Sequence, residues 1–258
     1  MKKYWLVFNA YLKMSFQKFI IYRGDLLVWA GVSIGWTLFS LIFYQILFLQ
    51  VPTIAGWTKE QVFILVGIYM IIDTFTWSFF WRNMQMYVES IFTGTLDFQL
   101  IKPIDTQFLL SFQHIGFTNM PRMIVGFFML GIYLKEVQPL YLFFSIVMSF
   151  FSLLVIYALW FFTSTFTFYV EKLDNIIEIV PAMRRVWSIP SDVFSGPVGA
   201  LFTIIIPLAL ISTTPSRILL GQIKWIEILI LPSFALLLFV GSRKFFHHAI
   251  KKYSSVGS

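Results

Sequence analysis

Residues 139–170 read PLYLFFSIVMSFFSLLVIYALWFFTSTFTFYV and contain no Asp, Glu, Lys or Arg. A helix needs about 20 apolar residues to cross the ~30 Å hydrocarbon core of a bilayer, so this stretch indicates a transmembrane helix. Similar apolar stretches precede and follow it. The predicted spans are 26–49, 61–81, 108–134, 139–170, 197–214 and 225–241. The sequence therefore predicts an all-α, polytopic membrane protein with six transmembrane helices.

Eighteen of the nineteen Lys and Arg residues are distributed unevenly over the gaps between these spans, and Arg122 lies inside a span. One set of alternate gaps contains Lys2, Lys3, Lys13, Lys18, Arg23, Arg82, Lys102, Lys172, Arg184, Arg185, Arg243, Lys244, Lys251 and Lys252. The other set contains only Lys59, Lys135, Arg217 and Lys224. Loops rich in Lys and Arg stay in the cytoplasm. We therefore expect both termini to be cytoplasmic, which agrees with an even number of spans.

The composition limits the chain to one transmembrane domain, 1–258, because 59% of its residues are hydrophobic and only 12% are charged. The net charge of +7 is dispersed among juxtamembrane gaps, where basic residues set orientation and meet anionic lipid. We therefore expect the bilayer, and no nucleic acid, as a partner. The absence of cysteine excludes disulfides, thiolate catalysis and cysteine-bound metals.

Residues 1–25 precede the first span with an amphipathic pattern. Aromatic and leucine side chains recur at helical spacing, at Trp5, Phe8, Leu12, Phe16 and Phe19, and polar residues occupy the other face. This pattern is typical of an interfacial helix lying on the membrane, although an extension of the first span would also fit it. We further expect a cytoplasmic loop over 171–196 and a cytoplasmic tail over 242–258.

The gap over 82–107 reads RNMQMYVESIFTGTLDFQLIKPIDTQ. Its pattern predicts a helix that stops at Gly94, a short amphipathic segment through Ile101, and a break at Lys102-Pro103. A short helix bounded in this way can place its apolar side in a groove on another protein.

Two charged residues fall deep inside predicted spans. Asp73 is as far along the chain from Glu60 as Arg122 is from Lys135, so both lie at a similar depth on consecutive helices. A lone charge at that depth costs about 2.5 to 3.5 kcal/mol on insertion scales. We therefore expect an intramembrane ion pair, which either fixes two helices or contacts cargo or a gating element.

Separately, Gly31 and Gly35 form a G-x-x-x-G pair that is a candidate helix–helix interface.

Catalytic and metal-binding motifs are missing from the sequence, and so is the G-x-x-x-x-G-K-[ST] motif that binds nucleotide phosphates. We therefore expect no catalytic residue, metal or cofactor in this chain. Two other functions remain open. One is a membrane-embedded lipid-modifying enzyme that uses Asp73, His114 and Arg122, and the other is a non-transporting assembly or sensor subunit.

Four short motifs resemble those of a known family. They are Ile91-x-Thr93-Gly94-x-Leu96-Asp97-x-x-Leu100-Ile101-Lys102-Pro103, Ile206-Pro207, Pro215-x-x-x-Leu219-Leu220-Gly221 and Tyr253-Ser254-Ser255-x-Gly257-Ser258. In this order they resemble bacterial type-2 ATP-binding cassette permeases, in the branch akin to daunorubicin-type exporters. The chain departs from the family in one place, because Ile189, and not an aromatic residue, precedes Pro190.

The resemblance implies a permease subunit of an ATP-driven exporter in the bacterial cytoplasmic membrane. It also implies a second permease subunit, identical or paralogous, and separate cytoplasmic ATPase subunits that bind ATP and Mg²⁺. The segment after the second span would be the coupling helix. Its ATPase-coupling residues would be Gly94, Leu96, Asp97, Leu100, Lys102 and Pro103.

Overall fold

The computed structural model describes residues 2–21, 23–134, 137–170 and 176–253, and this part of the chain is helical without a named strand. Predictions that concern Lys135, Lys172 or residues 254–258 lie outside the described residues. The helical elements are α1 (Lys2–Ile21), α2 (Arg23–Gln50), α3 (Lys59–Phe75), η1 (Thr76–Trp81), α4 (Arg82–Phe92), α5 (Asp97–Leu100), α6 (Thr106–Phe112), α7 (Met120–Tyr133), α8 (Pro139–Thr165), η2 (Phe166–Phe168), η3 (Ile176–Glu178), α9 (Ile179–Trp187), η4 (Ser191–Val193), α10 (Gly196–Ala200), η5 (Leu201–Ile205), α11 (Leu210–Leu219) and α12 (Trp225–Ile250).

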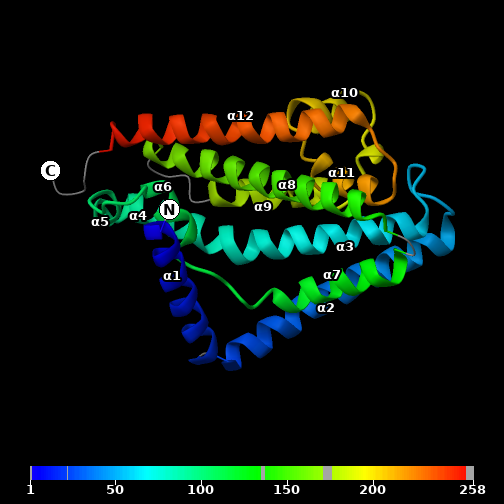
Figure 1. Cartoon of the computed structure of the whole chain (residues 1–258), viewed down its shortest axis with the longest axis horizontal. Coiled ribbons are helices and arrows are strands. Elements are labelled where there is room, and N and C mark those ends of the chain that lie inside the picture. The colour runs from blue at the N-terminus through cyan, green and yellow to red at the C-terminus, as the bar shows by residue number, and fades with distance from the viewer. Residues whose placement is uncertain (1, 22, 135–136, 171–175, 254–258) are drawn as a thin grey trace.

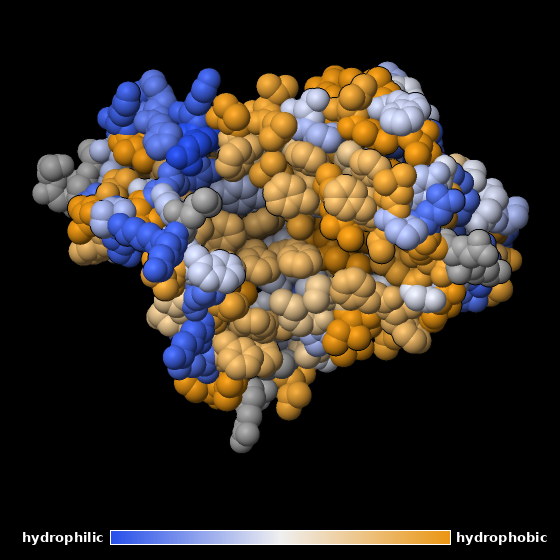
Figure 2. Space-filling model, in the orientation of Figure 1, coloured by the Kyte–Doolittle hydropathy of each residue, from blue (hydrophilic) through white to orange (hydrophobic). Residues whose placement is uncertain are grey.

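Long apolar helices dominate the molecule. In the described chain, four are long and apolar enough to cross a membrane, namely Leu27–Gln50, Lys59–Phe92, Pro139–Phe168 and Trp225–Ile250. Three of them, which contain α3, α8 and α12, run side by side along the long axis, while α2 slants away from them (Figure 1). Apolar residues cover the middle of the visible face, and hydrophilic residues gather at its two ends (Figure 2). These features confirm the predicted all-α, polytopic membrane fold.

The two ends of the bundle are defined by contacts between distant segments. At the α5 end, Lys3 donates to the carbonyl of Pro103 at 2.7 Å, and Arg243 pairs with Asp105 at 2.5 Å. Both described chain ends therefore lie at this end, as expected for termini on one side of a membrane. The opposite end, which we call the Trp57 end, contains the loop before α3. That the α5 end faces the cytoplasm stays a prediction.

The predicted cytoplasmic loop over 171–196 is wrong for its described part, because this segment passes through the bundle. Arg184 of α9 lies inside it and contacts Asp73. Asp192, only a few residues later, accepts a hydrogen bond from the indole nitrogen of Trp57 at 2.8 Å. The chain has thus reached the Trp57 end by residue 192.

The hydropathy of the sequence does not identify α9 as a segment that passes through the bundle. The helix buries Val180 and Trp187, next to the buried Ile176 of η3, but it also carries Arg184 and Arg185 next to each other. A hydropathy profile counts each guanidinium as exposed to water, whereas the first of these is neutralised by a carboxylate from another helix. Without these two arginines, Lys and Arg are still concentrated toward the predicted cytoplasmic side.

The predicted fifth span, 197–214, is also wrong. Its residues form α10 and η5, which meet α11 at a bend of 79°. Asp192 lies just before α10 and pairs with Arg217 near the end of α11, so this bent pair starts and finishes at the Trp57 end. It is a re-entrant hairpin, and every residue of α11 is buried. Only four helices of the described chain are long and apolar enough to cross a membrane, so the count of six spans stays a prediction, with α9 and not 197–214 as the candidate for the fifth.

The third predicted span, 108–134, is interrupted between α6 and α7, which leaves α7 with only 14 residues. Other segments satisfy the backbone groups freed by this break. The replacement bonds run from Asn83 Nδ2 to the carbonyls of Ser111 and His114 (both 2.8 Å), from His114 N to Asn83 Oδ1 (2.9 Å), from Ile115 N to Ser15 Oγ (3.1 Å) and from Gly116 N to Ser78 O (2.8 Å). Non-helical backbone at membrane depth is tolerated when protein groups satisfy it in this way.

The N-terminal helix α1 is separate from α2 and turns away from it at the α5 end (Figure 1). Its aromatic side chains pack on the interrupted stretch, with Phe8 against Phe112 and both Phe16 and Phe19 against Phe117. A straight extension of the first span is therefore excluded. The position of α1 on the membrane surface remains a prediction.

The tail over 242–258 is helical through Ile250, where α12 ends. Its described part therefore continues the last long helix, and its cytoplasmic location stays a prediction.

Candidate functional site

A cluster of one buried carboxylate and two partly buried arginines lies in the middle of the bundle. Asp73 on α3 is 1% exposed. Arg184 reaches both of its oxygens, with Nε 2.6 Å from Oδ1 and Nη2 2.5 Å from Oδ2. Arg122 on α7 contacts Oδ2 through Nη1, also at 2.5 Å. The structure thus brings the predicted partners Asp73 and Arg122 together and adds a third residue that the sequence analysis had placed in a loop.

Two glycines set the distance between the helices that carry Asp73 and Arg122. A Cβ atom on Gly126 of α7 would lie 2.9 Å from the carbonyl oxygen of Gly67 on α3, and one on Gly67 would lie 3.0 Å from that of Gly126. Only glycine permits such a close approach of two helix backbones. This contact brings the start of α7, which carries Arg122, beside the last turn of α3, where Asp73 lies.

Aromatic rings surround the two guanidinium groups. The ring centroid of Tyr69 lies 5.2 Å from the Cζ atom of Arg122 and 5.9 Å from that of Arg184. Arg184 also lies 5.4 Å from the Trp77 ring. Such cation–π contacts attract a cation more strongly when it is shielded from water. Both arginines are therefore held in fixed positions by Asp73 and by aromatic faces.

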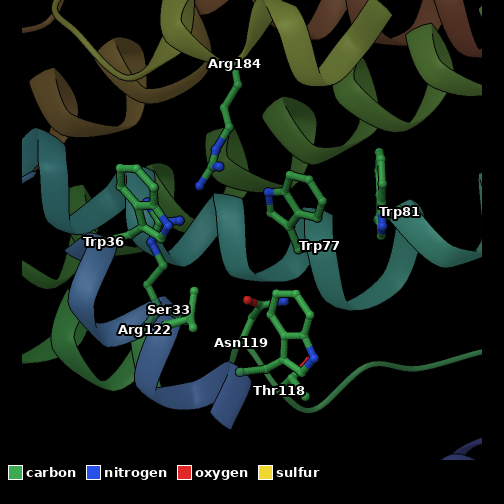
Figure 3. A pocket seen from close by; sticks show the side chains of 10 residues that line it. Ser33, Trp36, Trp77, Trp81, Thr118, Asn119, Arg122 and Arg184 are labelled. Atoms are coloured by element: carbon green, nitrogen blue, oxygen red, sulfur yellow. The ribbon is translucent and has the colours of Figure 1, made fainter. Parts of the chain in front are cut away.

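A cavity of about 670 Å³ adjoins this cluster. Both arginines and the polar residues Ser33, Thr118 and Asn119 line it. Most of its remaining wall is tryptophan, with Trp77 and Trp81 from η1 facing side chains of α2 (Figure 3). The full lining is Trp29, Val32, Ser33, Trp36, Trp77, Trp81, Thr118, Asn119, Arg122 and Arg184. Its size and mixed apolar and charged walls are typical of a small-molecule site.

The segment predicted to couple to an ATPase forms a compact turn at the α5 end. Helix α4 ends at Phe92, and Gly94 adopts a φ of 71° that favours glycine. Leu96, although predicted as a contact residue, is 0% exposed. It anchors the turn to the protein's own core and cannot contact a partner in this structure.

The face that α5 leaves exposed was missed in part by the sequence analysis. Phe98 is 66% exposed and Ile101 is 78% exposed. Among the predicted residues, Lys102 and Pro103 are exposed, while Asp97 and Leu100 are partly buried. The helical spacing indicates an amphipathic segment, but α5 is too short for that spacing to fix which side is buried.

An ion pair fastens this turn to the last helix. Asp105 caps α6 by accepting a hydrogen bond from Phe108 N at 3.0 Å, and it pairs with Arg243 of α12. Partial burial alone would raise the pKa of Asp105, but the hydrogen bonds from Arg243 and from the Phe108 N–H outweigh burial and lower it. Asp105 therefore links the turn after α5 to α12.

The Trp57 end is held by a second ionic network. Arg217, which is 3% exposed, pairs with both Asp192 and Glu227. Lys224 lies 3.2 Å from Asp192. Burial would raise the pKa of Asp192, but the Trp57 indole N–H, Arg217 and Lys224 lower it. The sequence analysis missed this network because its members come from separate segments.

The other predicted site residues lie apart from the arginine cluster. A Cβ on Gly31 or Gly35 would meet no described atom within 4 Å, so this pair makes no close contact within the described chain, and an intermolecular interface there stays a prediction. Among the described residues, no hydrogen bond or ion pair joins His114 to Asp73 or Arg122. The same residues contain no group of three His, Cys, Asp or Glu side chains that could hold a metal.

Comparison with known proteins places the whole arrangement in a family. Neither a curated protein nor a solved structure matches the chain. A sequence profile of the ABC-2 family transporter proteins matches residues 34–257, which include all of the arginine cluster and the coupling segment. This match confirms the resemblance to type-2 permeases, while the daunorubicin-type branch stays a prediction. The chain belongs to the ABC-2 family of transporter proteins.

Proposed function

We propose that this chain is the membrane-spanning permease subunit of an ATP-driven exporter in the bacterial cytoplasmic membrane. It forms half of the translocation pathway together with a second permease subunit, identical or paralogous. Separate cytoplasmic ATPase subunits bind ATP and Mg²⁺, and the chain itself hydrolyses no nucleotide. Family membership over residues 34–257 supports this proposal.

The observation that carries the proposal is the exposed apolar surface of the α5 turn. Phe98 and Ile101 are 66% and 78% exposed on the α5 turn, which lies at an end of the molecule where hydrophilic residues gather (Figures 1 and 2). Apolar side chains exposed together at a polar surface typically mark a protein contact. The buried Leu96 fixes the turn to the protein core, and Asp105 fixes it to Arg243 of α12. A force on this surface is therefore transmitted to α4 and α12.

ATP then acts through the ATPase pair and not on this chain directly. Closure of the ATPase subunits moves the α5 turn, and the turn moves the helices attached to it. This motion shifts the population between two arrangements of the permease, because the ATPase binds one of them more tightly.

Copurification with the cognate ATPase tests the coupling surface. Ile101→Asp places a charge in the proposed contact, and we expect it to abolish copurification and ATP-dependent transport while membrane insertion survives. Val51→Asp is the matched control, because Val51 is also exposed but lies in the loop after α2, toward the Trp57 end. Normal assembly and transport by Ile101→Asp would refute the coupling surface. ATP hydrolysis by the purified chain alone would refute the proposal that only the separate ATPase subunits hydrolyse ATP.

A further inference from the structure

We propose that the tryptophan-lined cavity binds an amphiphile with an anionic group, whose anion contacts Arg122 and Arg184 and whose apolar body lies against the tryptophans. This inference rests on the proposed function and names the chemical class of its cargo. The occupant is thus a carboxylate or phosphate attached to a hydrocarbon body.

The charges around the cavity do not balance. Arg122 and Arg184 both line it, but the single carboxylate of Asp73 lies behind them and does not. Arg184 occupies both oxygens of Asp73, and Arg122 shares only one of these. The buried Nε of Arg122 has no hydrogen-bond partner among the described residues. One positive charge more than Asp73 balances therefore lies at the wall of the cavity.

An unbalanced guanidinium in the middle of an apolar bundle is unfavourable, and partnering is its usual remedy. Guanidinium groups bind carboxylates and phosphates through parallel N–H donors. An ammonium group in the same place would meet like charge. The cluster therefore selects anions over cations.

The walls fit the apolar remainder of such a molecule. Trp77 and Trp81 stand next to each other on η1 (Figure 3), and Trp29 and Trp36 complete the wall from α2. The α2 side is open, because Trp29 is 61% and Trp36 is 68% exposed. Within the most apolar stretch of this helix, only 6% of the residues are buried inside the protein. A lipophilic molecule can therefore reach the arginines from the side, past α2.

Quenching of tryptophan fluorescence tests this site without ATP or ATPase. The full chain is reconstituted in phosphatidylcholine nanodiscs and titrated with a fatty acid brominated on its chain, or with a brominated alkyltrimethylammonium of equal length. We expect saturable quenching by the fatty acid at a membrane fraction at least about tenfold lower than for the cation, which is the discrimination of one charge-assisted contact. An excess of unlabelled fatty acid should reverse it, and unlabelled alkyltrimethylammonium should not.

Four variants connect the signal to the cavity. Arg184→Gln and Arg122→Gln each leave Asp73 with one arginine and make the cluster neutral, so anion selectivity should be lost. Arg184→Lys retains the charge and should retain selectivity. Lys244→Gln removes the same charge from an exposed position on α12 and should behave as wild type. The elution volume of each variant on a sizing column and its tryptophan emission without quencher verify that it is folded. The competition between brominated and unlabelled fatty acid is measured on the wild-type protein and needs no variant.

Equal quenching by the anionic and cationic probes, or full anion selectivity in both glutamine variants, would overturn the proposal. So would the absence of quenching together with a Ser33→Cys cross-link between two copies, because a second subunit would then fill the cavity. Brominated phosphatidylglycerol distinguishes the sources of the anion. If it displaces the fatty acid, the occupant is a membrane lipid; if it does not, the occupant is a single-chain amphiphile. A failed binding test leaves the permease proposal standing, since ATPase copurification is measured separately.

Discussion

Replacing Asp73 with Asn removes the one buried carboxylate that two partly buried arginines share. Both Arg122 and Arg184 then lose their ionic partner, and no other carboxylate contacts either of them among the described residues. Breaking a buried ion pair by removing one partner typically costs about 3 to 5 kcal/mol. We expect Asp73→Asn to lower the free energy of unfolding by that amount.

The arginine variants should be milder because the carboxylate stays paired. After Arg122→Gln, Asp73 keeps both of its contacts with Arg184. The loss is then about 1.5 to 3 kcal/mol, the range for a hydrogen bond to a charged group. The double variant Asp73→Asn/Arg122→Gln should recover only part of the loss, since Arg184 is still without a partner. A two-residue pair would instead predict nearly full recovery.

The assay is reversible unfolding of the purified chain in mixed micelles at increasing fractions of a denaturing detergent, followed by near-ultraviolet circular dichroism. All three variants and the wild type are compared in one double-mutant cycle. If Arg122→Gln destabilises the protein as much as Asp73→Asn, or if the double variant regains wild-type stability, then Arg184 is not a partner of Asp73.

Two further predictions follow from the packing of α7 and from the α5 turn. Gly126→Ala should destabilise the protein by about 1 to 3 kcal/mol, typical for overpacking, because its Cβ would lie 2.9 Å from a backbone oxygen. Gly31→Ala is the control in the same unfolding assay, because Gly31 has open space around it. Equal losses of stability in the two variants would refute the close contact. The lowered pKa of Asp105 stabilises the fold fully above the ordinary Asp value of about 3.9, and this contribution is lost as the pH falls through the lower folded value. Thermal unfolding scans of wild type and Asp105→Asn should therefore differ at neutral pH and converge in acid, and a constant difference across that range would contradict the role of Arg243.

The long apolar helices were predictable because each carries its own signal. The stretches within α2, α8 and α12 contain enough consecutive apolar residues to cross a bilayer whatever surrounds them. Hydropathy reads that property one segment at a time. The same reasoning placed Asp73 and Arg122 at matching depth, since two charges inside consecutive apolar spans need a common explanation.

The remaining features depend on partners that are distant in sequence. Asn83 supplies the hydrogen bonds that let residues between α6 and α7 leave the helix, and no local pattern in that stretch reports their source. Arg184 looks like a loop residue until Asp73 is placed beside it. The exposure of Phe98 and the burial of Leu96 are decided by the turn at Gly94, and not by the periodicity of a four-residue helix.

The contact between Arg184 and Asp73 also constrains how the protein is made. Helices leave the ribosome in order, and a helix as polar as α9, with its two adjacent arginines, is a poor substrate for the insertion machinery on its own. By the time α9 emerges, α3 has already been synthesised and offers a carboxylate as a counter-ion. We therefore expect α9 to be placed by docking onto α3 rather than by partitioning into lipid on its own, so that α3 assists the assembly of a helix made later.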